Sequence, residues 1–173
     1  MMAQVQEGEL AFDFSTAVHV ERLDAQGKPL PTGMALVDFV VEEDTHILLV
    51  EIKDPSQARV PESERKAFVE KMKRQTLIHE ELVPKARDSY TFLHLMARDA
   101  KPFLYVVLLG LDEFPNDRAL LLSLKGRLLR RLRHEAQEPW RREYVTDCVV
   151  VTLETWSKHF PHFRISRNPE PVS

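Results

Sequence analysis

Three charged residues interrupt apolar segments of the sequence in which charged side chains are unusual. Asp38 is the one charged residue of Met34–Val41, and Glu51 and Lys53 occur near the end of Ile47–Lys53. A carboxylate in an apolar strand is costly unless a cation or a proton neutralises it. Paired carboxylates are the hard oxygen ligands that Mg²⁺ or Mn²⁺ prefers, and such ions keep waters that substrate phosphate can displace. These residues therefore predict a divalent-metal site that acts on a phosphate.

The two apolar segments are expected to form neighbouring strands of an antiparallel hairpin. Both are short and β-branched, which is typical of strands that are covered on both faces. The connection between them is short and polar, as a hairpin loop requires. If Glu42 pairs with Ile47 across a four-residue loop, Asp38 lies directly opposite Glu51 on one face of the hairpin. Because side chains alternate along a strand, Lys53 shares that face with Glu51.

A structural ion cluster is the alternative explanation of these charges. Lys53 can pair with Glu51 or with Asp38 without any bound metal. Such a cluster of two carboxylates and one lysine keeps a net charge of −1, which a semi-buried position compensates poorly. We therefore favour the metal site over the ion cluster.

The same residues resemble the active-site signature of the PD-(D/E)XK nuclease superfamily, whose members have the restriction-endonuclease-like fold. The signature is Asp38, twelve intervening residues, and then Glu51-Ile52-Lys53 on the second strand of a hairpin. The surrounding segments are similar to those of small bacterial members, although Val37 replaces the proline of the name. The resemblance implies Mg²⁺- or Mn²⁺-dependent hydrolysis of DNA. Asp38 and Glu51 would be metal ligands, the Ile52 carbonyl a third ligand, and Lys53 the catalytic lysine.

The core of this superfamily, helix–strand–strand–strand–helix–strand, would cover approximately residues 12–110, with residues 112–173 as an elaboration. Many members add an acidic residue from the helix before the hairpin, and Glu21 is the candidate here. The segment from Phe12 to Leu23 permits two interpretations, a helix capped by Ser15 or a strand with alternating apolar residues. The role of Glu21 depends on the first interpretation.

The rest of the chain alternates predicted helices and strands. Helices are expected over 63–82, 85–97, 117–133 and 154–159, and strands over 103–109, 144–153 and 162–166. This order predicts one α/β domain over residues 1–173, with a mixed central sheet and helices on both faces.

Positive charge is concentrated in one part of the chain. Residues 118–142 contain eight Lys or Arg and two Glu, whereas the whole chain has a net charge of −3. The basic helix either contacts the phosphate backbone of DNA or presents an ordinary solvated face. Its leucine face is a candidate surface for a homodimer. The candidate DNA contacts are Lys85, Arg87, Arg127, Arg130 and Arg131.

Several classes of protein are excluded by what the sequence lacks. It has no Gly-rich phosphate loop and no Ser/His/Asp arrangement, so kinases and acyl-transfer enzymes have no support. The single Cys148 cannot form an internal disulfide, and no apolar segment is long enough to span a membrane. We therefore expect a cytoplasmic nuclease with DNA as its partner. The alternative is an inactive binding module that keeps the nuclease fold without turnover.

Overall fold

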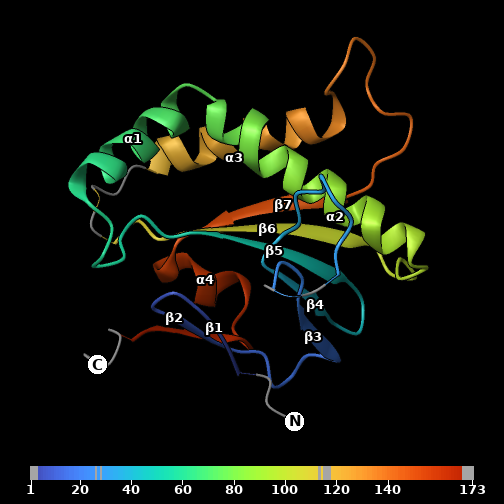
Figure 1. Ribbon diagram of the computed structural model, residues 1–173, viewed down its shortest axis with the longest axis horizontal. Helices are drawn as coiled ribbons and strands as arrows, with labels where there is room; N and C mark the ends of the chain where they lie inside the picture. The colour runs from blue at the N-terminus through green and yellow to red at the C-terminus, as the bar shows by residue number, and fades with distance from the viewer. Residues whose placement is uncertain (1–3, 26, 28, 113, 115–117, 169–173) are drawn as a thin grey trace.

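A mixed five-stranded sheet forms the centre of the computed structural model, which describes residues 4–25, 27, 29–112, 114 and 118–168 (Figure 1). The strand order is β3-β4-β5-β6-β7. Strands β3, β4 and β5 are antiparallel, whereas β5, β6 and β7 are parallel. The strands are β3 (His19–Arg22), β4 (Phe39–Glu42), β5 (Ile47–Lys53), β6 (Phe103–Leu109) and β7 (Asp147–Val151).

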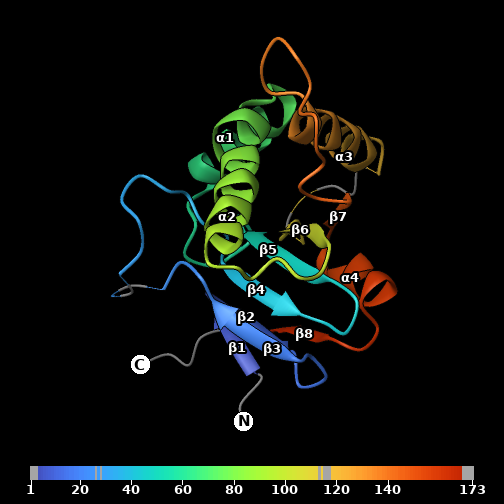
Figure 2. The same ribbon diagram turned by 90° about the vertical axis from the view of Figure 1, so that its right-hand side faces the viewer.

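One face of this sheet is covered by a layer of helices (Figures 1 and 2). They are α1 (Glu62–Lys73), the π-helical segment η1 (Leu77–Leu82), α2 (Val83–Leu95) and α3 (Arg118–Arg133). Leu124, Leu128 and Leu132 of α3 are buried in the core between this layer and the sheet. No helix of the described chain is long and apolar enough to cross a membrane.

The opposite face is covered mainly by a second, smaller sheet. Its antiparallel strands are β1 (Gln4–Glu7), β2 (Leu10–Asp13) and β8 (Arg164–Arg167), in the order β1-β2-β8. The short helix α4 (Leu153–His159) lies beside them (Figure 2). The predicted mixed sheet with helices on its two faces is thus confirmed, but the face that α4 covers differs from the expectation because the small sheet covers most of it. Phe12 and Phe14 explain the difference, because they alternate toward the central sheet as strand residues do.

The predicted hairpin register is confirmed. Glu42 pairs with Ile47, and the N–H of Glu43 donates to the carbonyl of His46 across the four-residue loop. Strand β4 is shorter than predicted, because it begins at Phe39 rather than at Met34. The backbone before it is bound to α2 instead of to a strand. The N–H of Ala35 donates to the Asp88 carboxylate, and the N–H of Val37 donates to the Ser89 hydroxyl.

The N-terminal segment adopts the strand alternative, so the helix capped by Ser15 is wrong. Strands β2 and β3 are separated by a turn in which the N–H of Ser15 donates to the Asp13 carboxylate at 2.9 Å. No helix precedes β3 in the part of the chain that the structure describes. The first helix of the expected nuclease core is therefore replaced by strands over the described residues 10–13 and 19–22.

The helix predicted over 63–82 is divided. Helix α1 ends at Lys73, and Gln75 adopts a φ of 64°, which interrupts the helix before η1 begins. Pro84 does not separate the next helix, because it lies in the first turn of α2, where a missing N–H costs little. Strand β6 has the predicted bounds, and α3 ends at Arg133 as predicted.

Candidate active site

Asp38 and Glu51 lie next to each other on the face of the central sheet that the helices cover. Phe39 pairs with Val50, so the same register brings Asp38 opposite Glu51. The amide N–H of Ile52 donates to Oδ2 of Asp38 at 2.7 Å, which ties the residue before β4 to strand β5. Both acidic side chains are buried, with exposed fractions of 6% for Asp38 and 1% for Glu51. The predicted pair of carboxylates is therefore brought together.

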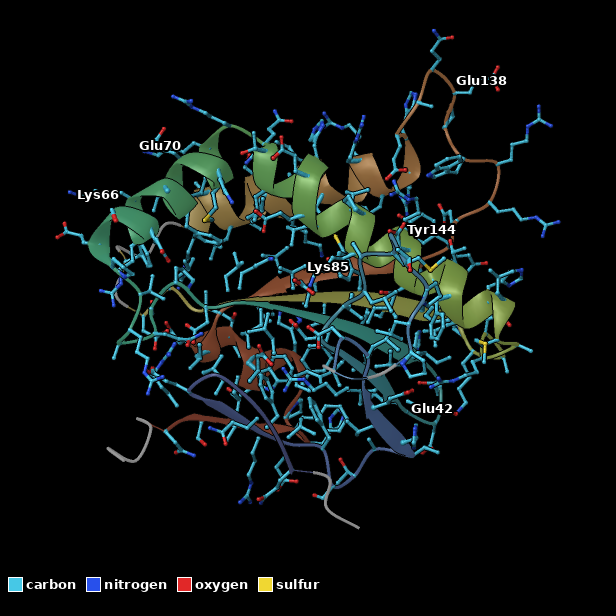
Figure 3. All side chains as sticks on the ribbon, in the orientation of Figure 1. Glu42, Lys66, Glu70, Lys85, Glu138 and Tyr144 are labelled. Atoms are coloured by element: carbon cyan, nitrogen blue, oxygen red, sulfur yellow. The ribbon has the colours of Figure 1, made fainter. Side chains whose placement is uncertain are left out.

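Two lysines share one oxygen of the Glu51 carboxylate. Oε1 of Glu51 lies 3.3 Å from Nζ of Lys53 and 3.1 Å from Nζ of Lys85. The second oxygen, Oε2, is buried without a hydrogen-bond partner among the described residues. Lys85 comes from α2 and lies between that helix and the sheet (Figure 3). Lys85, which the sequence predicts as a DNA contact, thus lies beside the carboxylates.

Glu81 is a further charged residue of the site that the sequence did not indicate. It lies on η1, where Oε2 is 2.8 Å from Nζ of Lys53 and Oε1 is 2.7 Å from Nζ of Lys71. The π-helical geometry of η1 decides which of its side chains reach Lys53. Helices of this kind are rare and often occur at functional sites, but local sequence does not predict them.

Asp24 is a second acidic residue that the sequence analysis missed. The N–H of Leu23 donates to the carbonyl of Asp38 at 2.9 Å, so the end of β3 passes beside the pair. Oδ1 of Asp24 lies 3.5 Å from Nε of Arg22. A contact with the Asp24 carboxyl also raises the pKa of Asp38. Leu23 lies opposite Asp38, and Asp24 follows it directly. This pairing is the signal that could have identified Asp24.

Burial and neighbouring charges together set the pKa values of the site. Burial, together with the negative charge of Glu51, raises the pKa of Asp38 to about 8. Burial also raises the pKa of Glu51, although Lys85 and Lys53 oppose the effect. Burial lowers the pKa of Lys53, but the carboxylates of Glu51 and Glu81 outweigh it, so the net shift is upward. Without a bound cation, burial and the charge of Glu51 therefore favour the protonated form of Asp38, and the neighbouring carboxylates favour the charged form of Lys53.

These residues fit a hard divalent cation that takes two protein carboxylates. The fit rests on the Glu51 oxygen that lacks a partner and on the proton that Asp38 holds, which a cation can replace. Within the described ranges, no group of three or more His, Cys, Asp or Glu side chains is placed to hold a metal ion. Two carboxylates are the donor set that Mg²⁺ or Mn²⁺ commonly takes from a protein, and they are fewer than the ligands of a fully enclosed structural metal.

Glu21 lies on the strand next to the hairpin, where it binds Arg98. It lies on strand β3 and not on a helix, and it pairs across the sheet with Val40. Its carboxylate oxygen Oε2 is 2.7 Å from a guanidinium nitrogen of Arg98. The helix on which the prediction of Glu21 depended is therefore wrong, and its role as a metal ligand stays a prediction.

The other predicted DNA contacts lie apart from the carboxylate pair. Arg87 is bound by carboxylates, 3.0 Å from Glu135 and 3.1 Å from Asp88. The three predicted arginines of α3 line a separate cavity. The leucine face of α3, which was the basis for expecting a homodimer, packs inside the chain. The predicted DNA contacts and the homodimer stay predictions.

A cavity of about 360 Å³ lies next to Lys53, between the end of β5 and α1. Of Asp38, Glu51 and Lys53, it is Lys53 that lines this cavity. The lining residues are Lys53, Asp54, Pro55, Val60, Glu64, Ala67, Phe68 and Lys71.

Comparison with models of protein families, with curated proteins and with solved structures found no match. The structure itself defines an α/β protein with a mixed five-stranded sheet and a separate three-stranded antiparallel sheet.

Proposed function

We propose that this chain is a divalent-metal-dependent nuclease of PD-(D/E)XK type that hydrolyses DNA phosphodiester bonds. The observation that carries the proposal is the pair of buried carboxylates, Asp38 and Glu51, on neighbouring strands of a hairpin with Lys53 on the same face. A buried pair of this kind needs a cation or a shared proton. The strands β2 and β3, which lie where a first helix was expected, set the described chain apart from the usual core of the restriction-endonuclease-like fold.

Each residue of the site has a role in this proposal. Asp38 and Glu51 would hold Mg²⁺ or Mn²⁺, with the Ile52 carbonyl as the proposed third ligand. When bound, the cation would polarise a phosphoryl oxygen and lower the pKa of the attacking water. Lys53 supplies positive charge where the phosphoryl group gains negative charge. Glu81 orients the Lys53 ammonium at the edge of the cavity beside α1.

The direct test is cleavage of supercoiled, linear, single-stranded and branched DNA in Mg²⁺ or Mn²⁺. Wild-type protein should cut at least one of these substrates, and Lys53→Ala should lower the rate by about 100-fold or more, because it removes the charge that faces the phosphate. Lys66→Ala is the matched control, since Lys66 lies exposed on α1 in a surface pair with Glu62. The control should cut as wild type does. Absence of metal-dependent cleavage, or equal rates for both variants, would contradict the proposal.

The second candidate is a binding module that keeps this site without turnover. The observation in its favour is that two lysine ammonium groups already neutralise Glu51, behind side chains that shield both carboxylates from solvent. Calorimetric titration with Mn²⁺ separates the two candidates. Binding that Asp38→Asn abolishes supports the nuclease, whereas absence of binding by wild-type protein supports the module.

A further inference from the structure

A second cavity of about 360 Å³ lies between α3 and the turn that joins α1 to η1. It shares no lining residue with the cavity beside Lys53. Its lining includes Arg127, Arg130, Arg131, His79, His134 and Gln75. The described lining contains no acidic side chain, so every charged group that faces this space is a cation.

The arginines of this cavity lack the counter-charges that the neighbouring cations have. On the same helix, Lys125 lies 3.9 Å from Asp147, and Arg133 lies 3.3 Å from Glu143. Arg130 and Arg131, in contrast, form no ion pair with any carboxylate that the structure describes.

Arg127 donates hydrogen bonds to backbone oxygens and not to carboxylates. Its guanidinium donates to the carbonyls of Ser123 and Met72, each at 3.3 Å. The nearby Glu135 does not reach the cavity lining, because its carboxylate is bound to Arg87. Three like charges around one space repel each other, and an anion in that space would relieve the repulsion.

We propose that this cavity binds a phosphoryl group. A guanidinium has several N–H donors in a planar fork that matches two oxygens of a phosphate, and it cannot accept hydrogen bonds. Gln75 and the two histidines add further donors for the remaining oxygens. The volume is near the lower limit of small-molecule sites, which suits one or two phosphoryl groups. The source is either a small phosphate ester or the backbone of a nucleic-acid strand.

This inference does not depend on the proposed nuclease activity. His79 lines the cavity, whereas Glu81, two residues later on η1, contacts Lys53. Residues two apart on a helix do not face the same side, so η1 separates the phosphoryl cavity from the carboxylate site. The cavity can therefore be tested while the proposed metal site is kept free of metal by a chelator.

The experiment measures binding of pyrophosphate and of a short single-stranded oligonucleotide in EDTA. Arg130→Ala with Arg131→Ala should weaken binding of at least one probe by about tenfold or more, because each arginine makes charge-assisted hydrogen bonds. The matched control is Arg141→Ala with Arg142→Ala, which removes the same charge from two exposed residues outside the cavity lining. The control should stay within about twofold of wild type, since only remote charge is lost.

The outcome also identifies the source of the phosphoryl group. A loss for pyrophosphate alone indicates a small phosphate ester, and a loss for the oligonucleotide indicates nucleic-acid phosphates. Failure of wild-type protein to bind either probe, or equal losses in the two double variants, overturns the inference. Circular dichroism verifies folding, and Arg130→Lys with Arg131→Lys provides a variant that keeps the charge. That variant should bind more weakly than wild type, because lysine lacks the planar fork.

Discussion

The two faces of the central sheet differ sharply although the same strands form both. On β5, Leu48, Val50 and Ile52 face the small sheet, whereas Glu51 and Lys53 face the helices. The first face packs against stacked and edge-on aromatic rings, with Phe14 and Phe163 centroids 5.0 Å apart. The second face buries a set of carboxylates and lysines. The pleat of one strand thus separates a dry core that stabilises the fold from a charged site that is suited to chemistry.

The largest effect on stability is expected on the aromatic face. Trp156 is fully buried, and its Nε1 donates to the carbonyl of Phe163 at 2.8 Å. Trp156→Ala should lower the free energy of unfolding by about 3–5 kcal/mol, because it leaves a large cavity. Urea unfolding measures the change. Trp140→Ala is the control, since Trp140 is 44% exposed, and it should change stability by less than about 0.5 kcal/mol. Similar losses for the two variants would show that the aromatic face is not the stabilising core.

A pH-dependent effect is expected on the charged face. The pKa of Asp38 is about 8 in the folded protein and about 3.9 in an unfolded chain, so the folded protein holds a proton that the unfolded chain has lost between these values. The contribution of protonated Asp38 to the free energy of unfolding is therefore fully present below pH ~4, and it is lost as the pH rises to about 8. The loss relative to Asp38→Asn should approach about 1.4 kcal/mol for each pH unit within that range.

Urea unfolding in EDTA from pH 5 to pH 8 measures this difference, because a chelator prevents a cation from replacing the proton. The Asp38→Asn variant serves as the reference, since groups elsewhere in the molecule titrate in both proteins. A difference that stays constant with pH would mean that Asp38 is ionised in the folded protein.

The smallest effect is expected at the edge of the charged face. Glu81→Gln removes the carboxylate that contacts Lys53 and Lys71, so the pKa of Lys53 should fall. Stability should change by less than about 1 kcal/mol, because Glu81 is partly exposed and solvent screens its pairs. NMR titration of the lysine ammonium groups measures the pKa change. Glu80→Gln, at the neighbouring exposed residue, is the control. An equal change of the Lys53 pKa in both variants would show that Glu81 does not act on Lys53.

Local sequence determined the hairpin and the face on which its charges lie. The short polar connection set the pairing of Glu42 with Ile47, and alternation along the strands then placed Asp38, Glu51 and Lys53 on one side. These features depend on neighbours within about 20 residues, so loop length and apolar pattern suffice to predict them. The same holds for β6 and for the buried leucines of α3, whose patterns are regular.

Only the tertiary structure decided which other charges meet this pair and how the N-terminal segment folds. Lys85 and Glu81 reach the hairpin because α2 and η1 pack across the sheet, and the turn at Gln75 sets the direction in which they do so. Phe12 lies on a strand because β2 pairs with β8, more than 150 residues away. Local patterns permitted both a helix and a strand there. The strand prevailed because long-range pairing satisfies its backbone hydrogen bonds and buries its aromatic side chains against the central sheet.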